Sequence, residues 1–243
     1  MQLGNVAFIG RKPLDYYKGL LIKADLGLHA QITAILKHEL MPGASIMDLG
    51  AGEGALSRRL MDQGFRVTAA DVDPESFRCA EVPFTKVDFD DPSELAKFVQ
   101  LHSNAYDAVI GIEVIEHVQD QWSYVRQLMA MAKPGGMVLI STPNTTSWLS
   151  RITFLRSGQF HQFSDSDLGY GHISPVTRWE LGLILRSAGA EHVSFRPGGT
   201  LPLLYLTGLN RGSLLSLMAL PVRLFMRGPT DGWCVIATGR KPR

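Results

Sequence analysis

A glycine-rich turn behind an acid is the part of this sequence best suited to chemistry. Residues 46–54 read I-M-D-L-G-A-G-E-G, so Gly50 and Gly52 alternate with other residues after Asp48. Glycines at this spacing let the backbone turn sharply and approach a ligand closely. The helix expected to follow has free N–H groups at its start. Asp71, at the end of the next predicted strand, can accept hydrogen bonds from both hydroxyls of a ribose.

Two classes of cofactor use this geometry, the dinucleotides and S-adenosylmethionine, and three features favour the second. Asp48 suits a ligand with a cationic amino-acid end and a sulfonium, whereas it would repel a pyrophosphate. A helical segment is predicted before the first core strand, and no Y-x-x-x-K pair of the short-chain dehydrogenases occurs. Gly50, Gly52 and Ala55 also fit the looser dinucleotide pattern G-x-G-x-x-G/A, so a nicotinamide-dependent oxidoreductase is the alternative.

Three histidines are candidates for the general base that a hydroxyl acceptor would need. His117 follows the fourth predicted strand, and its imidazole titrates in the useful pH range. His172 and His161 belong to a long polar and aromatic segment further along the chain. Glu113, just before His117, is another candidate for the acceptor side. A capping or packing role competes with the catalytic role for the histidines, and a fold that only binds the cofactor as a regulatory subunit is the second alternative.

These residues are positioned by strands and helices that alternate along most of the chain. Alternation predicts a parallel sheet with helices on both faces. The predicted strands are residues 45–49, 66–70, 84–87, 106–112, 137–141, 191–196 and 233–238. The predicted helices are residues 28–40, 55–63, 74–80, 92–101, 122–132 and 174–188. Ligands in such sheets bind beyond the carboxyl ends of the strands, which is where the glycine turn, Asp71 and Glu113 lie.

Taken in this order, the motifs resemble the class I methyltransferase family over roughly residues 25–196. Within that family, residues 112–118 (I-E-V-I-E-H-V) and 142–144 (T-P-N) resemble the ubiquinone-biosynthesis O-methyltransferase group. The resemblance implies an S-adenosylmethionine-dependent, O-directed methyl transfer. It implies a cofactor site of Asp48, Gly50, Gly52, Asp71, Asp88, Phe89 and Ile112, with Glu113, His117 and His172 on the acceptor side. An N-terminal basic residue also contacts the cofactor in that group, and Lys23 and His29 are the candidates here.

The fold expected from this resemblance is α/β and Rossmann-like. It has a doubly wound seven-stranded sheet, mostly parallel with an antiparallel last strand, in a three-layer α/β/α arrangement. We expect one methyltransferase domain over residues 1–243. Its parts are an N-terminal helical segment (1–43), the core (44–196 and 231–240), an acceptor-side loop insertion (143–173) and an apolar, basic insertion (197–230).

The same region raises the question of a metal ion. Glu113, Glu116, His117 and a downstream histidine resemble the metal-binding set of the small-RNA 2′-O-methyltransferases. Carboxylate and imidazole ligands of this kind can hold a divalent ion. The run E-V-I-E-H also occurs in metal-free relatives, however, and the chain shows no basic patch for RNA. The sequence therefore predicts no metal site.

The two insertions indicate what the acceptor is. Aromatic residues in 143–173 favour acceptor specificity there, with packing on the sheet as the alternative. Residues 197–230 contain no acid, but Arg211, Arg223 and Arg227 lie among leucines and methionines. Such a segment can lie on an anionic membrane, cover an apolar substrate, form a homodimer contact or fill the core. We expect a small or lipid-linked acceptor and a peripheral membrane contact.

Composition sets the remaining limits. The chain has 243 residues, 45% of them hydrophobic, enough for one large folded domain. Its net charge of +1 gives no reason to expect a nucleic-acid partner. The two cysteines, Cys79 and Cys234, lie far apart, which fits a reducing compartment. With no signal peptide and no apolar run long enough to span a bilayer, a cytoplasmic or membrane-peripheral location is expected.

Overall fold

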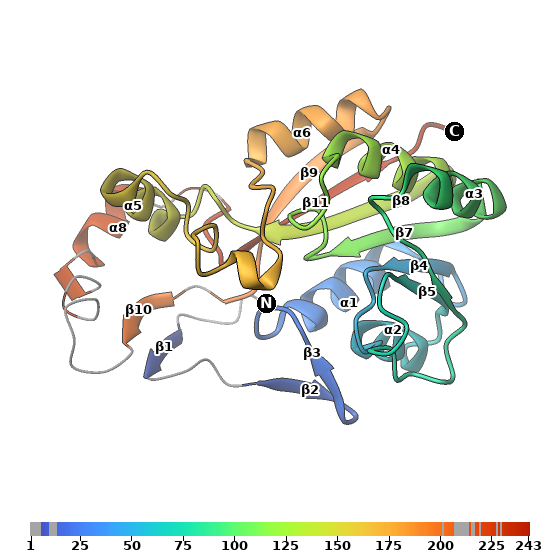
Figure 1. Cartoon of the computed structure of the whole chain (residues 1–243), viewed down its shortest axis with the longest axis horizontal. Coiled ribbons are helices and arrows are strands. Elements are labelled where there is room, and N and C mark those ends of the chain that lie inside the picture. Colours follow the sequence, from blue (N-terminus) through green and yellow to red (C-terminus); the bar gives the residue numbers. More distant parts are fainter. Residues whose placement is uncertain are drawn as a thin grey trace.

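The computed structural model describes residues 6–9, 14–200, 202–206, 214, 217–218, 220–226, 228 and 230–243. A seven-stranded sheet in the order β6-β5-β4-β7-β8-β11-β9 forms its centre (Figure 1). The strands are β4 (Ser45–Leu49), β5 (Arg66–Asp71), β6 (Phe84–Lys86), β7 (Tyr106–Ile112), β8 (Ala132–Pro143), β9 (Glu191–Gly198) and β11 (Cys234–Arg240). β11 runs antiparallel to both of its neighbours, β8 and β9, whereas the pairs on the β4 side are parallel. The predicted sheet is confirmed.

Helices cover both faces of this sheet. α1 (Leu28–Glu39) and α2 (Ala55–Asp62) lie on one face, and α3 (Pro92–His102), α4 (Gln121–Met131) and α6 (Arg178–Ser187) lie on the other (Figure 1). Each face has its own apolar core: Leu36 and Leu60 belong to the first, Leu128 and Leu185 to the second. Because the central strands are buried on both sides, they read as continuous apolar runs. The three-layer α/β/α arrangement is therefore confirmed.

Two of the predicted helices differ from the structure. Residues 74–80 form turns, in which the Asp73 carboxylate accepts hydrogen bonds from the backbone N–H groups of Glu75 and Ser76. A segment this short gains too few helical hydrogen bonds to repay nucleation. α6 begins at Arg178 rather than at residue 174, because the N–H group of Ser174 donates to the carbonyl of Glu116. The helix is capped instead by Thr177, whose hydroxyl accepts from the N–H group of Glu180 at 3.1 Å.

The two insertions and the N-terminal segment are also more structured than predicted. Residues 143–173, expected to be loop, contain α5 (Trp148–Ser157) and a short 3-10 turn (Leu168–Tyr170). The segment 1–43, expected to be helical, contains the hairpin β2 (Asp15–Tyr17) and β3 (Leu20–Ile22) before α1. β1 (Val6–Ile9) pairs in parallel with β10 (Pro202–Leu206). The β1–β10 pairing joins distant segments, so local sequence patterns do not reveal it.

The segment 197–230 is described only in part. After β10, the structure describes a 3-10 turn (Leu220–Val222) and α8 (Arg223–Met226), which packs near α5 at one end of the molecule (Figure 1). Arg211, Arg227 and the side chain of Arg223, on which the basic character of this insertion depends, lie outside the described residues. Within the described part of the chain, no helix is long and apolar enough to cross a membrane.

Candidate cofactor and acceptor site

A cavity of about 920 Å³ opens beyond the carboxyl ends of β4, β5 and β7. It brings together segments that are far apart in the sequence: the β3–α1 connection, the glycine turn, the ends of β5 and β7, and the loop between α5 and α6. Ten of the residues that matter for the argument line it: Lys23, His29, Gly50, Gly52, Asp71, Asp88, Phe89, Ile112, His117 and His172. The cavity lies at the edge where an open α/β sheet binds its ligands.

The glycine turn is shaped by positive φ angles and by close packing. Gly50, Gly52 and Gly54 have φ angles of 75°, 55° and 86°, a region that side-chain-bearing residues rarely adopt. A Cβ atom on Gly50 would collide with Cγ2 of Val114. Among the described residues, a Cβ atom on Gly52 would meet only Cδ of Lys23, at 3.7 Å. Gly50 is thus required by packing, whereas Gly52 leaves backbone open to the cavity.

Asp71 is held in place by the same turn. Its Oδ2 accepts a hydrogen bond from the backbone N–H group of Gly52 at 2.8 Å, and its Oδ1 accepts from that of Asp73 at 3.0 Å. Each carboxylate oxygen can accept more than one hydrogen bond. The carboxylate is therefore oriented toward the cavity by its backbone partners and keeps lone pairs for two ribose hydroxyls.

Asp48 lies behind the turn and is absent from the residues that line the cavity. Its side chain is buried, and its Oδ2 accepts a hydrogen bond from the hydroxyl of Ser57 on α2 at 2.5 Å. Burial raises the pKa of the Asp48 carboxyl to about 6, with a smaller contribution from the charge of Asp71. The side chain thus links β4 to the first turn of α2, and a contact between Asp48 and a cofactor stays a prediction.

The neighbouring acids Asp88, Asp90 and Asp91 after β6 have different hydrogen-bond partners. Asp91 caps α3 by accepting from the N–H groups of Ser93 and Glu94. Asp90 accepts from the N–H group of Gln119 at 2.9 Å, which ties this loop to the one after β7. Asp88 lines the cavity beside Phe89, and so does Ile112. Asp90 lines the cavity as well, so two of these three acids face it, and the role of Asp88 in holding a cofactor stays a prediction.

The β2–β3 hairpin supplies a wall that the sequence did not indicate. The backbone N–H group of Leu21 donates to Oε2 of Glu53 at 2.9 Å, which anchors the hairpin on the glycine turn. This contact brings Lys23 and His29 to the cavity. Burial, with the charge of Arg59 second, lowers the pKa of His29 to about 3, so this imidazole is neutral at pH 7. Lys23 is consequently the better placed cation for an anionic end of a ligand.

His117 and His172 also line the cavity, where they form a pair. We call the glycine turn and Asp71 the cofactor wall, and this pair with its neighbours Glu113, Glu116 and His161 the acceptor wall. The ring centroids of His117 and His172 are 5.1 Å apart. Nδ1 of His117 lies 3.0 Å from the carbonyl oxygen of Gly171, and Nδ1 of His172 lies 2.8 Å from that of Gln162. A carbonyl oxygen can only accept, so Nδ1 carries the proton in both rings and each Nε2 presents a lone pair. Burial, followed by the charge of His172, lowers the pKa of His117.

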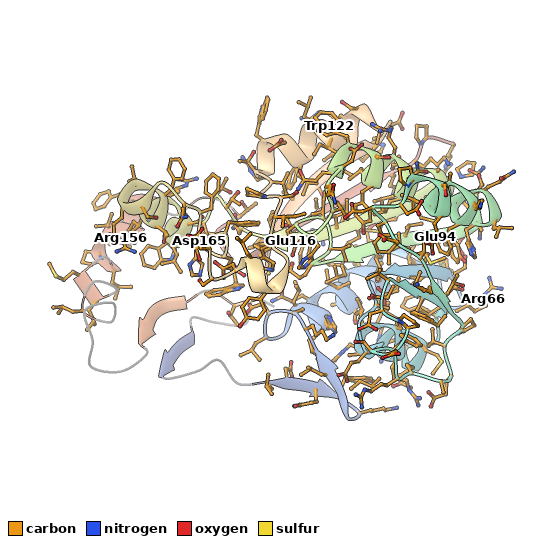
Figure 2. The ribbon with its side chains drawn as sticks, in the orientation of Figure 1. Arg66, Glu94, Glu116, Trp122, Arg156 and Asp165 are labelled. Atoms are coloured by element: carbon orange, nitrogen blue, oxygen red, sulfur yellow. The ribbon has the colours of Figure 1, made fainter. Side chains whose placement is uncertain are left out.

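Glu113 and Glu116 have different surroundings, although they flank the same turn. Oε1 of Glu113 accepts a hydrogen bond from the hydroxyl of Ser141 at 2.8 Å, and its Oε2 accepts from Sγ of Cys234 at 3.2 Å. Glu116 is completely buried at the centre of the molecule (Figure 2). Neither of its carboxylate oxygens has a hydrogen-bond partner among the described residues. Burial and the charge of Glu113 raise the pKa of Glu116 well above its usual range.

His161, the third histidine named from the sequence, lies deeper in the same wall. Its ring packs edge-on against Trp233 with the centroids 5.0 Å apart. Burial lowers its pKa to about 4. A neutral imidazole packed on an indole fits a structural or acceptor-contacting role better than proton transfer.

Comparison with known proteins agrees with this geometry. A family model described as a methyltransferase domain matches residues 27–194. The chain is 34% identical over 110 residues to a ubiquinone biosynthesis O-methyltransferase from Methylobacterium sp., a match that covers 44% of each chain. It is 30% identical over 149 residues to a probable S-adenosylmethionine-dependent methyltransferase from Mycolicibacterium smegmatis, covering 61% of this chain and 52% of that one. The chain thus spans about half the length of the curated relatives it matches.

Solved structures show the same fold. A SAM-dependent methyltransferase from Archaeoglobus fulgidus superposes with a TM-score of 0.60 at 15% identity, covering 88% of this chain and 94% of that one. The family match covers most of the sheet, from α1 to β9, and includes every residue of the glycine turn. The resemblance noted from the motifs is thereby confirmed, and the chain belongs to the methyltransferase-domain family.

Proposed function

We propose that the protein is an S-adenosylmethionine-dependent methyltransferase that methylates a hydroxyl oxygen of a small or lipid-linked acceptor. The observation that carries this proposal is the cavity itself. Its lining includes the glycine turn and Asp71, which form the cofactor wall, and the His117–His172 pair, which forms the acceptor wall. A cofactor held by the glycine turn and Asp71 would therefore share the cavity with the imidazole of His117, which can accept a proton.

The residues of the first wall fit S-adenosylmethionine. Gly52 leaves open backbone, Asp71 has lone pairs for the ribose hydroxyls, and Asp88 and Phe89 are placed for the adenine. Lys23 supplies a cation for the carboxylate of the amino-acid end. When bound, this cofactor supplies a methyl group on a sulfonium, whose thioether leaves without acid catalysis. The protein then has to orient the acceptor and remove its proton.

His117 is the residue we assign to proton removal. Its Nδ1–H group donates to the carbonyl of Gly171, so its lone pair is on Nε2. The lowered pKa keeps the ring neutral and able to accept a proton near pH 7. His172 donates in the same way to Gln162 and orients the pair. Glu113 also lines the cavity, and its carboxylate is held in place by hydrogen bonds from Ser141 and Cys234 at the end of the sheet.

The acceptor class is argued from the exposed surface of α5 and α8, because the loop that follows α5 lines the cavity with His161 and Gln162. Side chains of α5 and α8 are apolar and exposed: Leu155 is 78% exposed and Phe225 is 89% exposed. Arg156 adds a positive charge on α5, at the same end of the molecule (Figure 2). Exposed apolar residues together with a cation favour a surface that touches an anionic membrane. An acceptor such as a prenylated phenol would reach the cavity from that surface, and the O-methyltransferase name of the first relative supports an oxygen as the target.

Calorimetric titration with S-adenosylmethionine, S-adenosylhomocysteine and NAD⁺ tests the cofactor assignment. We expect the first two to bind and NAD⁺ not to bind. Asp71→Asn removes the charge that holds the ribose hydroxyls and should weaken binding by about tenfold to a hundredfold, the range for hydrogen bonds to a charged group. Asp91→Asn changes an acid that only caps α3 and should leave the affinity unchanged. Binding of NAD⁺ alone would replace this proposal by an oxidoreductase.

Vesicle flotation tests the membrane surface separately. The protein should float with vesicles that contain phosphatidylglycerol and not with pure phosphatidylcholine. Replacing Leu155 and Phe225 together by serine should abolish flotation. The matched control is Leu101→Ser, because Leu101 is 81% exposed on α3, at the other end of the molecule. Equal flotation of all three proteins would contradict a contact through α5 and α8.

A further inference from the structure

Two aromatic side chains meet in the cavity at residues that neither the cofactor nor the proton removal uses. His161 and Trp233 both line the cavity, and their rings pack edge-on with centroids 5.0 Å apart and an angle of 88° between the ring planes. The two residues come from separate parts of the chain, since His161 follows α5 and Trp233 directly precedes β11. The tertiary fold therefore builds this arrangement, which we call the His161–Trp233 contact.

The strand order places the His161–Trp233 contact away from the expected cofactor residues. Asp71 ends β5 and Asp88 follows β6, and these two strands form one edge of the sheet. Trp233 precedes β11, which is separated from β5 by β4, β7 and β8. β11 runs antiparallel to β8, so its first residue, Cys234, lies opposite Pro143 at the carboxyl end of β8. The contact thus lies in the part of the cavity that remains for the acceptor.

The same region adjoins the histidine assigned to proton removal. Gln162, next to His161, also lines the cavity, and its carbonyl oxygen lies 2.8 Å from Nδ1 of His172. The ring of His172 packs in turn against that of His117. Gln162 has a φ angle of 70°, a strained value that is common at ligand-binding sites. The His161–Trp233 contact is therefore the neighbouring surface for the rest of an acceptor whose hydroxyl meets His117.

Backbone hydrogen bonds hold both rings in position. The N–H group of His161 donates to the hydroxyl of Ser150, a fully buried residue of α5, at 3.1 Å. The N–H group of Trp233 donates to the carbonyl of Thr200 at 2.7 Å, and the carbonyl of Trp233 accepts from the N–H group of Asn144 at 3.0 Å. A site that selects its ligand needs side chains whose positions are fixed before binding. These three bonds provide that support.

The imidazole of His161 has no polar partner within the part of the chain that the structure describes. Neither ring nitrogen accepts or donates a hydrogen bond there, and Nε2 is also buried. A neutral imidazole offers one N–H donor and one lone pair. Because a polar group that loses water without gaining a partner costs free energy, an acceptor oxygen bonded to this ring would gain by it.

The charges around His161 favour an uncharged group. Burial lowers the pKa of His161 to about 4, so the ring adds no positive charge at pH 7. The carboxylate of Asp167 also lines the cavity and acts on His161 as a nearby negative charge. Residues 158–173 contain no lysine or arginine. An anionic substituent would therefore meet a like charge and find no cation in this loop.

From this arrangement we infer that His161 and Trp233 form an acceptor subsite, which takes an aromatic ring against the indole of Trp233 and an uncharged oxygen substituent of that ring against the imidazole of His161. The inference rests on the proposed methyltransferase function, because the ring belongs to the molecule that receives the methyl group. An indole suits a flat ring, since aromatic pairs gain more than their buried area alone provides. His161 is thus a specificity residue, and His117 remains the residue that removes the proton.

Three small phenols test the subsite while the full-length chain is saturated with S-adenosylhomocysteine. 3-Hydroxybenzamide carries an uncharged oxygen substituent, 3-hydroxybenzoate has the same shape with a negative charge at pH 7, and phenol has no substituent. Calorimetric titration measures the affinity for each. We expect wild type to bind 3-hydroxybenzamide about threefold to tenfold more tightly than phenol, the range for one hydrogen bond between neutral groups. 3-Hydroxybenzoate should bind no better than phenol.

Variants separate recognition by His161 from a packing role. His161→Phe keeps a ring against Trp233 without a polar atom, so the preference for 3-hydroxybenzamide over phenol should fall below about twofold. His161→Gln keeps a donor and an acceptor and should retain the preference. Trp233→Leu removes the aromatic surface and should weaken binding of all three phenols by a similar factor. His38→Ala removes an exposed histidine beside Glu39 on α1 and should match wild type.

The ratio of affinities decides the outcome, because a merely structural role of His161 would change all three affinities alike. The same preference in wild type and His161→Phe would overturn the inference, and so would a preference for 3-hydroxybenzoate in wild type. Binding of none of the three phenols by a chain that binds S-adenosylhomocysteine would overturn the subsite and leave the proposed function intact. Failure to bind S-adenosylhomocysteine would contradict the proposed function and the subsite with it.

Discussion

The polar side chains on the two walls of the cavity differ in their hydrogen bonding. On the cofactor wall, acids are used by the turn they shape: Asp71 accepts from Gly52, and Asp48 accepts from Ser57. On the acceptor wall, Glu116 and Nε2 of His161 are buried without a hydrogen-bond partner among the described residues. Carboxylates that already accept hydrogen bonds are held in place before any ligand arrives. Buried polar groups without a partner mark the places where a bound ligand would gain most.

We expect the largest effect on cofactor affinity from adding one methyl group to the glycine turn. Gly50→Ala places a Cβ atom on Val114 at a φ angle of 75°, so the turn cannot close. We expect loss of S-adenosylmethionine affinity by more than about a hundredfold, together with destabilisation beyond the roughly 1–2 kcal/mol of the left-handed backbone alone. Calorimetric titration and urea unfolding measure the two effects.

Gly64→Ala is the matched control for this change. Gly64 has a similar φ angle of 87°, but apart from its chain neighbours no atom of the described residues lies within 4 Å of its Cβ position. It should lose only the backbone contribution of about 1–2 kcal/mol and retain cofactor affinity. If both variants bound the cofactor equally well, the packing of Gly50 on Val114 would not shape the site.

A smaller effect, on the pH dependence of stability, is expected from His161 on the acceptor wall. The folded-state pKa of His161 is about 4, below the ordinary value of 6.5. The stability it contributes is therefore present above pH 6.5 and is lost as the pH falls toward 4, by about 3 kcal/mol in total. His161→Phe keeps an aromatic ring against Trp233 and cannot be protonated. Urea unfolding at pH 7 and pH 4 should show a smaller acid loss in the variant, whereas His38→Ala should follow the wild type.

The smallest effect concerns Asp48 on the cofactor wall. Its folded-state pKa of about 6 lies above the ordinary value of 3.8, so the stability linked to its proton is present below pH 4 and is lost as the pH rises through 6. Asp48→Asn should raise the free energy of unfolding by about 3 kcal/mol at pH 8 and by nothing near pH 4. A gain of equal size at both pH values would show that titration is not its source.

Much of the cofactor wall could be predicted because its geometry is local. The turn, its glycines and Asp71 lie within one strand–turn–helix–strand unit, where residue type and spacing determine the path of the backbone. Asp48 shows the limit of that reasoning. The sequence places an acid beside the turn, but only packing decides that it points to Ser57 and away from the cavity.

The acceptor wall could be predicted only in part. His117 and His172 were identified by residue type, and the structure brings them together. Helix α5, the β2–β3 hairpin and the later start of α6 were missed, because each depends on a distant partner: α8, Glu53 and the carbonyl of Glu116. Local propensity does not register such long-range contacts.

By itself, then, the sequence determined the alternation of strands and helices, the glycine turn and the position of Asp71 at the end of the next strand, since these follow from periodicity and from the backbone freedom of glycine. Only the tertiary structure decided that the carboxylate of Glu116 is buried without a hydrogen-bond partner among the described residues, that Glu113 is held by Ser141, and that His172 meets His117. The physical reason is that these facts depend on contacts between segments far apart in the sequence, such as the hydrogen bond from His117 to Gly171, which is 54 residues away.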